Sequence, residues 1–365
     1  MKLSRLLTKN LVVVLVLALL LGVAAGCADN TGKPAETTVA ATAAKTEPAE
    51  TDPAESVATT AAAPAETTAA PTAPAAADPL NVVALKGPTS LGLLKMIDEQ
   101  QDRYNVSIQG APDAVVPMVV SGEADIACVP SNLAAVLYNK TEGNVHVIGV
   151  NTLGILHLVE MGDTVQSIAD LKGKKVISSG KGAVPEYLFN MVLERNGLKE
   201  GDVEIEYVAD HQSVLAALSA GDASIAVLPQ PFLTVAMNKL EGLRVVADLS
   251  EESGIPVVMG VYLATKDAVE NKADQLKAFI ADAGASVEFV NANPAEAGEL
   301  SEKYDIIKPA PIAAQAIPHC SIVCITDAAA MEEHLMPFLE AMHGYNPKTV
   351  GGKLPGDDFI MDFSK

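Results

Sequence analysis

The feature that most constrains this chain is a segment that occurs twice, 99 positions apart. The first copy covers residues 119–132 and reads VVSGEADIACVPSN, and the second covers residues 218–231 and reads LSAGDASIAVLPQP. Each copy has the pattern of a helix that ends at a glycine, then an acidic turn and a short apolar strand that stops at a proline. A spacing near 100 residues is too long for a solenoid repeat. The repeat therefore predicts two similar lobes.

Strand and helix signals alternate on both sides of this repeat. Residues 80–85 read as a buried strand, residues 91–101 as a helix and residues 204–208 as another strand. The stretch 82–97 also parallels the stretch 176–191. Strands that alternate with helices of ten or more residues are typical of parallel α/β packing. We therefore expect an α/β fold built from two three-layer lobes.

A signal-like segment precedes this part of the chain. Residues 1–26 have a basic head without an acid, followed by an aliphatic run of about a dozen residues, which is typical of a secretory signal and short for a membrane span. The run ends in Ala24-Ala25-Gly26-Cys27, which resembles a bacterial lipobox. Cys27 is therefore expected to be lipidated and to attach the protein to a membrane. An ordinary signal-peptidase site is the alternative.

The next segment has an unusual composition. Residues 28–78 contain 19 Ala, 11 Thr and 6 Pro, and such a stretch buries too little apolar surface to offset its ordering entropy. Residues 27–78 are therefore predicted to be a disordered tether that carries a folded domain at 79–365.

That domain has 20 basic and 38 acidic residues, a net charge of −18 against −21 for the whole chain. This balance excludes a general nucleic-acid binder, which needs clustered Lys and Arg.

Three cysteines lie in the domain. We expect Cys128, Cys320 and Cys324 to be buried free thiols, with a disulfide from Cys128 to either of the others as the alternative. Residues 319–324 read as a strand, along which Cys320 and Cys324 would lie roughly 13 Å apart, too far to bridge each other. No HExxH, no CxxC and no cluster of histidines with carboxylates occurs, so we expect no metal and no cofactor. Four histidines are interpreted as structural: His146, His157, His334 and His343.

The order of these segments resembles the solute-binding proteins of bacterial ABC importers with the two-lobed type II periplasmic-binding fold. Within that class it is most similar to the nitrate, sulfonate, taurine and thiamine-pyrimidine binding group. The resemblance rests on GEADIA at residues 122–127, IADLKGKKV at 168–176 and GGKLP at 351–355. It implies two hinge strands, near residues 155–160 and 257–264. These would join lobe one, about 79–155 plus 258–365, to lobe two, about 160–255.

The same resemblance implies a function and partners. A small polar or anionic solute, such as a sulfonate, a carboxylate or a pyrimidine-like compound, would bind between the lobes. The protein would be a monomer, anchored by its lipid on the extracytoplasmic face of the cell membrane, and would deliver the solute to an ABC permease and its ATPase. An enzyme is not expected, because no GxSxG motif occurs. An enzyme on the same scaffold and a surface-tethered sensor or adhesin remain as alternatives.

Candidate ligand contacts lie in the loops that follow the predicted strands, where open α/β sheets bind ligands. In lobe one they are basic, hydroxyl and amide side chains: Lys86, Thr89, Ser90, Ser131, Asn132, Asn151 and Thr152. In lobe two they come from a glycine-rich loop and two helix starts: Gly180, Lys181, Gly182, His211 and Gln230. Structural alternatives exist, since Thr89 or Ser90 could be a helix cap and Lys181 a solvated lysine.

Overall fold

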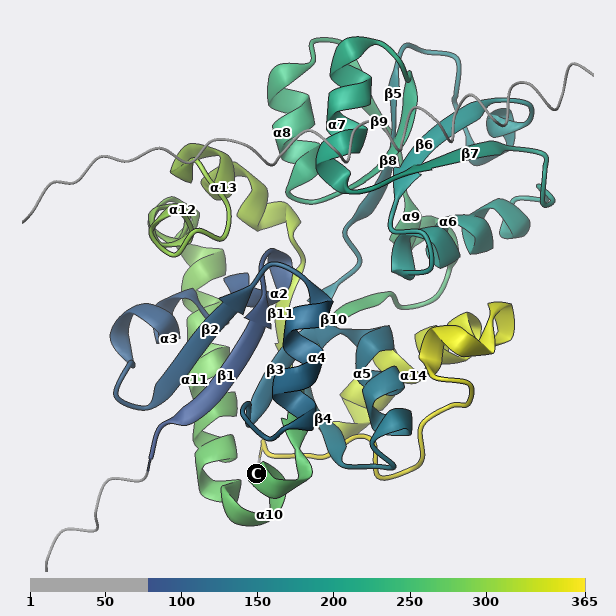
Figure 1. Cartoon of the computed structure of the whole chain (residues 1–365). Coiled ribbons are helices and arrows are strands. Elements are labelled where there is room, and N and C mark those ends of the chain that lie inside the picture. Colours follow the sequence, from purple (N-terminus) through teal and green to yellow (C-terminus); the bar gives the residue numbers. More distant parts are fainter. Residues whose placement is uncertain (1–77, 365) are drawn as a thin grey trace, which may run out of the picture. The chain divides into compact units, whose positions relative to one another are not determined.

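The computed structural model describes residues 78–364, so the predicted signal, Cys27 and nearly all of the predicted tether lie outside the described residues. Two separate sheets, each with helices packed against it, form this part of the chain (Figure 1). The predicted α/β class with two lobes is therefore confirmed.

The first sheet has six strands in the order β11-β4-β10-β3-β1-β2. They are β1 (Leu80–Leu85), β2 (Tyr104–Gln109), β3 (Ile126–Pro130), β4 (Val145–Leu153), β10 (Val258–Thr265) and β11 (Ile322–Ile325). β1 is parallel to β2 and β3, whereas β10 runs antiparallel to β3 and β4. The sheet is therefore mixed, with its parallel part on the β1 side.

Helices cover both faces of this sheet. Alternate side chains of β1 point to opposite faces, so that Val82 and Val83 belong to different cores. The Val82 core includes α3 (Leu94–Glu99) and α11 (Ala273–Ala292), and the Val83 core includes α4 (Pro112–Val120), α5 (Ser131–Lys140) and α14 (Ala328–Tyr345). Shorter elements complete the layers: α2 (Pro88–Leu91), α10 (Lys266–Asn271), α12 (Pro294–Lys303), α13 (Ala310–Ala316), η2 (Ile317–His319) and η3 (Pro347–Val350).

The second sheet has five strands in the order β7-β6-β8-β5-β9. They are β5 (Leu156–Met161), β6 (Lys175–Ser179), β7 (Glu204–Val208), β8 (Ile225–Pro229) and β9 (Leu243–Asp248). Its two faces are covered by α7 (His211–Ala220) with α8 (Phe232–Lys239), and by η1 (Ile168–Leu171) with α6 (Val184–Arg195) and α9 (Leu249–Ser253). Each lobe therefore has three layers.

The repeated sequence occupies the same place in both sheets. Its two strands are β3 and β8, and each has a parallel partner on one side and an antiparallel one on the other. β10 places Gly260 opposite Pro130, and β5 places Leu156 opposite Pro229. The repeat therefore reflects two copies of one strand arrangement.

The chain passes between the sheets twice. Gly154 and Ile155 connect β4 to β5, and residues 254–257 connect α9 to β10. The strands expected near 155–160 and 257–264 are β5 and β10, each displaced by one residue, and each belongs to a single sheet. The connections themselves are therefore short loops.

Two local expectations were wrong. The helix expected at 91–101 is divided into α2 and α3 by a turn at Gly92 and Leu93, and Gly92 lies so close to α11 that a Cβ there would be 2.9 Å from Val287 Cγ2. The strand expected at 319–324 begins only at Ile322, because His319 ends η2. Cys128 and Cys320 are buried, Cys324 is half-buried, and all three are free thiols, as expected.

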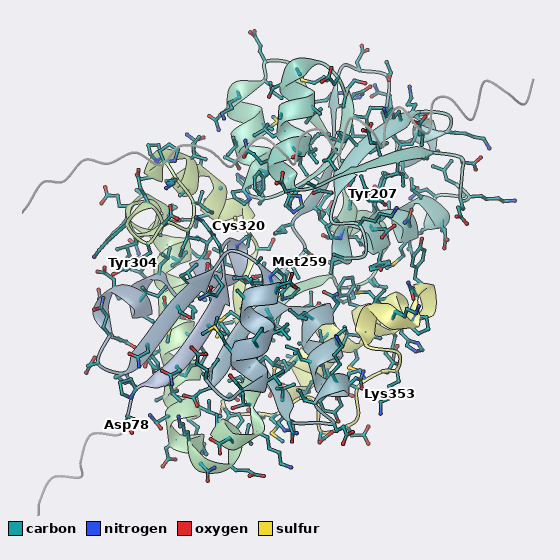
Figure 2. The ribbon with its side chains drawn as sticks, viewed as in Figure 1. Asp78, Tyr207, Met259, Tyr304, Cys320 and Lys353 are labelled. Atoms are coloured by element: carbon teal, nitrogen blue, oxygen red, sulfur yellow. The ribbon has the colours of Figure 1, made fainter. Side chains whose placement is uncertain are left out.

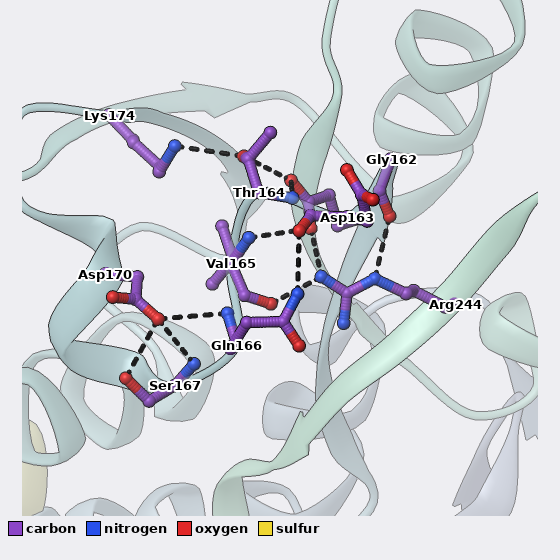
Figure 3. A network of polar contacts seen from close by, with 10 residues as sticks. Gly162, Asp163, Thr164, Val165, Gln166, Ser167, Asp170, Lys174 and Arg244 are labelled. Atoms are coloured by element: carbon purple, nitrogen blue, oxygen red, sulfur yellow. Dashed lines mark hydrogen bonds and ion pairs between the residues drawn. The ribbon is translucent and has the colours of Figure 1, made fainter.

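Buried carboxylates stabilise the edge of each sheet that lies away from the connecting loops. In the second sheet, Glu160 is 2% exposed, accepts hydrogen bonds from the backbone of Thr164 and Val165 at 3.0 Å each, and pairs with Arg244 (Figure 3). Burial raises the pKa of Glu160, but these hydrogen bonds outweigh it and hold the pKa below its usual value. In the first sheet, Asp125 pairs with Lys272 Nζ at 2.8 Å.

Candidate functional site

Strand direction brings the predicted ligand contacts to one edge of each sheet. In the first sheet β1, β3 and β4 end at this edge and β10 begins there, with Gly260 paired to both Pro130 and Thr152. In the second sheet β6 and β8 end beside the start of β5, where Leu156 pairs with Pro229. Both edges adjoin the connecting loops, and we call them the first edge and the second edge.

Hydroxyl groups at the first edge donate to the backbone nearby. Thr89 Oγ1 donates to Leu85 O at 3.1 Å, Ser90 Oγ to Gly87 O at 2.9 Å, and Ser131 Oγ to Val258 O at 2.5 Å. Ser90 and Ser131 are fully buried, and α2 is a single turn. These hydroxyls therefore stabilise the loops of the first edge.

Three predicted residues meet around one glycine. Thr89, Asn151 and Thr152 surround Gly260, where a Cβ would overlap Asn151 Oδ1 and lie 2.6 Å from Thr89 Cγ2. Asn151 is 2% exposed, and its Oδ1 accepts from Thr152 Oγ1 at 2.9 Å. Within residues 78–364 its Nδ2 has no hydrogen-bond partner. In this cluster of three side chains, Asn151 Nδ2 is the donor that can bind a ligand.

The other two predicted residues of the first edge have protein partners. Lys86 Nζ lies 2.6 Å from Asp305 Oδ2, and Lys308 Nζ lies 2.5 Å from Asp305 Oδ1. The two lysines lower the pKa of Asp305 to about 2, Lys308 having the larger effect. Asn132 Nδ2 donates to Thr349 O at 3.5 Å. Lys86 therefore already has an anionic partner.

The second edge holds a histidine and a glycine-rich loop. Ser179 Oγ lies 2.5 Å from His211 Nδ1, and the His211 ring centroid lies 5.2 Å from that of Phe232. Burial lowers the pKa of His211, and Asp210 opposes this effect. The imidazole is therefore neutral at pH 7.

The glycine-rich loop leads into α6. The Gly182 N–H donates to Glu186 Oε2 at 2.5 Å, and Gly180 has a φ of 75° beside Pro185. Lys181 is exposed, with Nζ 5.7 Å from the ring centroid of Tyr207, which lies on β7 (Figure 2). Lys181 is the predicted basic residue of this edge, and it is turned toward an aromatic ring.

Gln230 lines a pocket of about 620 Å³. Gln230 Oε1 accepts from Thr234 Oγ1 at 2.7 Å. Other residues around the pocket come from β5, α8, β9, α13 and η2, and they include His157, Met237, Asp248, Gln315 and His319. Asn238 Nδ2 donates to Gln315 Oε1 at 2.8 Å, which joins α8 to α13. The pocket therefore has walls from both lobes.

Of the residues that line this pocket, the sequence predicted only Gln230 as a ligand contact. The sequence places His157 in an apolar strand, which favours a structural role, and Asp248, Gln315 and His319 lie in no motif. For His157 and Asp248 the sequence signal is position, since His157 lies at the start of β5 and Asp248 is the last residue of β9.

Two general properties bear on the site. In residues 78–364 no three or more His, Cys, Asp or Glu side chains are placed to hold a metal ion. Over the same residues, no helix has both the length and the apolar character needed to cross a membrane.

Solved structures share this architecture. An ABC transporter protein from Parabacteroides distasonis is 25% identical with a TM-score of 0.69, over 78% of this chain and 99% of that one. The periplasmic aliphatic sulphonate binding protein SsuA from Escherichia coli is 19% identical with a TM-score of 0.62, over 79% and 94%. The alkanesulfonate-binding protein SsuA from Xanthomonas axonopodis pv. citri bound to MOPS is 14% identical with a TM-score of 0.60, over 79% and 99%. At such identities the two SsuA proteins show the fold alone.

Sequence comparison agrees with the structural likeness. A "Putative binding protein" of Brucella abortus (strain 2308) is 23% identical over 168 residues, which are 46% of this chain and 52% of that protein. The chain thus spans about half the length of the curated relatives it matches. A family model described as NMT1/THI5 like matches residues 105–297, which is more than half of the 365 residues, and the chain therefore belongs to the NMT1/THI5-like family.

Proposed function

We propose that this protein is the extracytoplasmic solute-binding component of an ABC importer. It captures a small polar or anionic solute between its lobes and delivers it to a permease. The observation that carries this proposal is the pair of matching sheet edges, both lined by polar side chains and both adjoining the two connecting loops. The family and the Parabacteroides transporter protein support it.

Binding would close the lobes by rotation at the connecting loops. Few residues need to absorb such a rotation, and the loops at 154–155 and 254–257 are short enough to confine it. A Cβ at Gly154 would overlap Ser250 Oγ, so the chain at this point has no space for a side chain. A solute that contacts both edges binds the closed form more tightly than the open form, and this difference in affinity sets how far it shifts the equilibrium toward the closed form.

The finer features belong to the same proposal. A lipid on Cys27 and a tether over residues 27–78 would hold a monomeric domain, with lobe one at about 79–155 plus 258–365 and lobe two at about 160–255, at the membrane surface beside the permease. We propose binding and not catalysis. An enzyme that used Ser179 with His211 would need the Ser179 hydroxyl at its substrate, yet Ser179 is only 1% exposed.

A thermal-shift screen of the purified protein tests the function. The solutes are MOPS and other sulfonates, nitrate, bicarbonate and thiamine precursors. We expect at least one to raise the Tm, because a ligand that binds only the folded state stabilises it by mass action. A screen in which no small solute raises the Tm would contradict the proposal.

A pair of lysine variants tests the site. Lys86 and Lys308 both contact Asp305, but only Lys86 directly follows a strand that ends at the first edge. Lys86→Gln should therefore weaken binding of an anionic solute several-fold, and Lys308→Gln should leave it unchanged.

The combined Thr89→Ala and Gln230→Ala variant should lose the thermal shift of any solute without unfolding. An unchanged shift would refute this placement of the site.

A further inference from the structure

The pocket of about 620 Å³ contains two hydrogen-bond acceptors that face each other. His157 Nδ1 lies 3.1 Å from Ile155 O. A carbonyl oxygen only accepts, so Nδ1 carries the hydrogen of the neutral ring and Nε2 carries the lone pair. Nε2 lies 3.5 Å from Asp248 Oδ2, which is an acceptor as well. This pair of atoms needs a donor.

The donor does not come from His157 itself at neutral pH. Burial lowers the pKa of His157, and His319 on η2 adds to this effect, while Asp248 on β9, the backbone of Ile155 and Glu251 on α9 oppose it. The ring is therefore neutral at pH 7. The acceptor pair persists under the conditions in which the protein would bind a solute.

Only one oxygen of Asp248 is available. Oδ1 accepts from the N–H groups of Ser250 at 2.7 Å and Glu251 at 3.4 Å, which makes Asp248 the N-cap of α9. Oδ2 points to His157, and the Asp248 side chain is 31% exposed. A charged oxygen with free acceptor capacity therefore lies beside the lone pair of His157.

The wall near this acceptor pair is apolar. Leu233, Met237 and Val245 line it, and Met237 and Val245 are 45% and 43% exposed, which is unusual for large apolar residues in the described part of this chain. The pocket lining includes no Phe, Tyr or Trp. A quaternary ammonium is recognised by aromatic faces, so this pocket suits a cation with N–H donors and a short carbon chain.

We propose that this pocket binds the ammonium group of a small organic amine. Its N–H groups donate to His157 Nε2 and Asp248 Oδ2, and its carbon chain packs on Met237 and Val245. The net charge of −18 over residues 79–365 attracts such a cation. This inference rests on the proposed function, because it names a chemical class of solute for a pocket with walls from both lobes.

Three probes of equal chain length test the proposal on the purified protein by NMR titration at constant ionic strength. They are n-butylammonium, 1-butanol and butanesulfonate, which differ in charge. We expect n-butylammonium to bind at least tenfold more tightly than the other two. Equal affinity for n-butylammonium and 1-butanol would overturn the proposal.

Asp248→Asn is the decisive variant. Asparagine is as good an N-cap as aspartate, so its oxygen keeps the bonds to α9 and the fold is retained. Its amide nitrogen then replaces Oδ2 and donates to His157 Nε2, which fills the place of the ammonium. Affinity for n-butylammonium should fall at least tenfold with an unchanged Tm. Asp267→Asn, an exposed acid on α10, is the matched control and should leave the affinity unchanged.

The pH dependence and a metal control complete the test. Once the pH falls below the lowered pKa of His157, the ring takes up a proton and supplies the missing donor itself, so n-butylammonium should bind more weakly there than at about pH 7.5. Zn²⁺ binding that Asp248→Asn abolishes, without any preference for the amine, would overturn the proposal in favour of a metal. Binding of sulfonates but not amines would refute this inference alone, whereas binding of no solute would refute the proposed function as well.

Discussion

The two sheets have the same strand arrangement around the repeated strands β3 and β8, but they differ in the residue that pairs with the end of each. Opposite the proline that ends the repeated strand, the first sheet has Gly260 and the second has Leu156. The missing side chain at Gly260 leaves space for Thr89, Asn151 and Thr152 to meet. Leu156 is completely buried. One strand arrangement therefore carries a glycine surrounded by polar groups in the first sheet and a buried leucine in the second.

The polar side chains of the two edges also differ in their partners. At the first edge, Ser90 and Ser131 donate to backbone carbonyls. At the second edge, Ser179 Oγ contacts the side chain of His211, and His157 Nε2 faces Asp248 Oδ2. Two hydroxyls of the first edge are therefore held by its backbone, whereas the second edge contains two histidines that respond to pH.

The largest expected effect on stability concerns the edge of each sheet that lies away from the connecting loops. Glu160 in the second sheet and Asp125 in the first are the buried carboxylates there. Glu160→Ala removes the carboxylate that pairs with Arg244 and leaves two backbone N–H groups without their acceptor, so we expect the free energy of unfolding to fall by about 3–5 kcal/mol. Urea denaturation measures it. Asp163→Ala, an exposed position in the same loop, is the control. A loss below about 1 kcal/mol would show that this network does not hold the second sheet.

The next effect tests the contrast at Gly260. Gly260→Ala forces a methyl group onto Asn151 Oδ1 and Thr89 Cγ2, and overpacking of this kind costs about 1–3 kcal/mol. We also expect weaker solute binding, since Asn151 must move. Gly284→Ala on α11 is the matched control, because its nearest neighbour would be Cys324 Sγ at 4.0 Å and alanine favours a helix. Equal stabilities of the two variants would show that the close approach at Gly260 is unimportant.

The smallest effect is the pH response of the second edge. Burial lowers the pKa values of His157 and His211 below 6.5, so the unfolded chain binds protons more readily than the folded one. The contribution of these two histidines to stability is therefore constant well above pH 6.5 and decreases as the pH falls below it. Urea unfolding at about pH 7.5 and about pH 5.5 measures this change.

A variant that combines His157→Gln and His211→Gln should show a weaker dependence of the free energy of unfolding on pH. His343→Gln on α14 is the control and should leave that dependence unchanged. If the double variant kept the full slope, the pH response would have to come from groups elsewhere.

Local patterns predicted most of the strands. β1 and β7 match their predicted ranges, because a short, largely apolar run (β1) and an alternation of charged and apolar residues (β7) both indicate strands. The helix expected at 91–101 was wrong, since a turn at Gly92 and Leu93 interrupts it. Gly92 packs against α11, almost 200 positions away along the chain, and such a contact leaves no local pattern. The predicted ligand residues do lie at the sheet edges, since strand direction decides that. Whether they contact a solute stays a prediction.

The sequence by itself determined the α/β class, the two lobes and the family resemblance, because these depend on periodicity, turn residues and a repeat that can be read along the chain. The tertiary structure alone decided which side chains meet. His157 faces Asp248 because β5 pairs with β9 in one particular register, and Thr89 meets Asn151 because α2 packs where β4 ends beside Gly260. Such contacts follow from sheet register and helix packing, which join residues far apart in the chain and leave no local pattern.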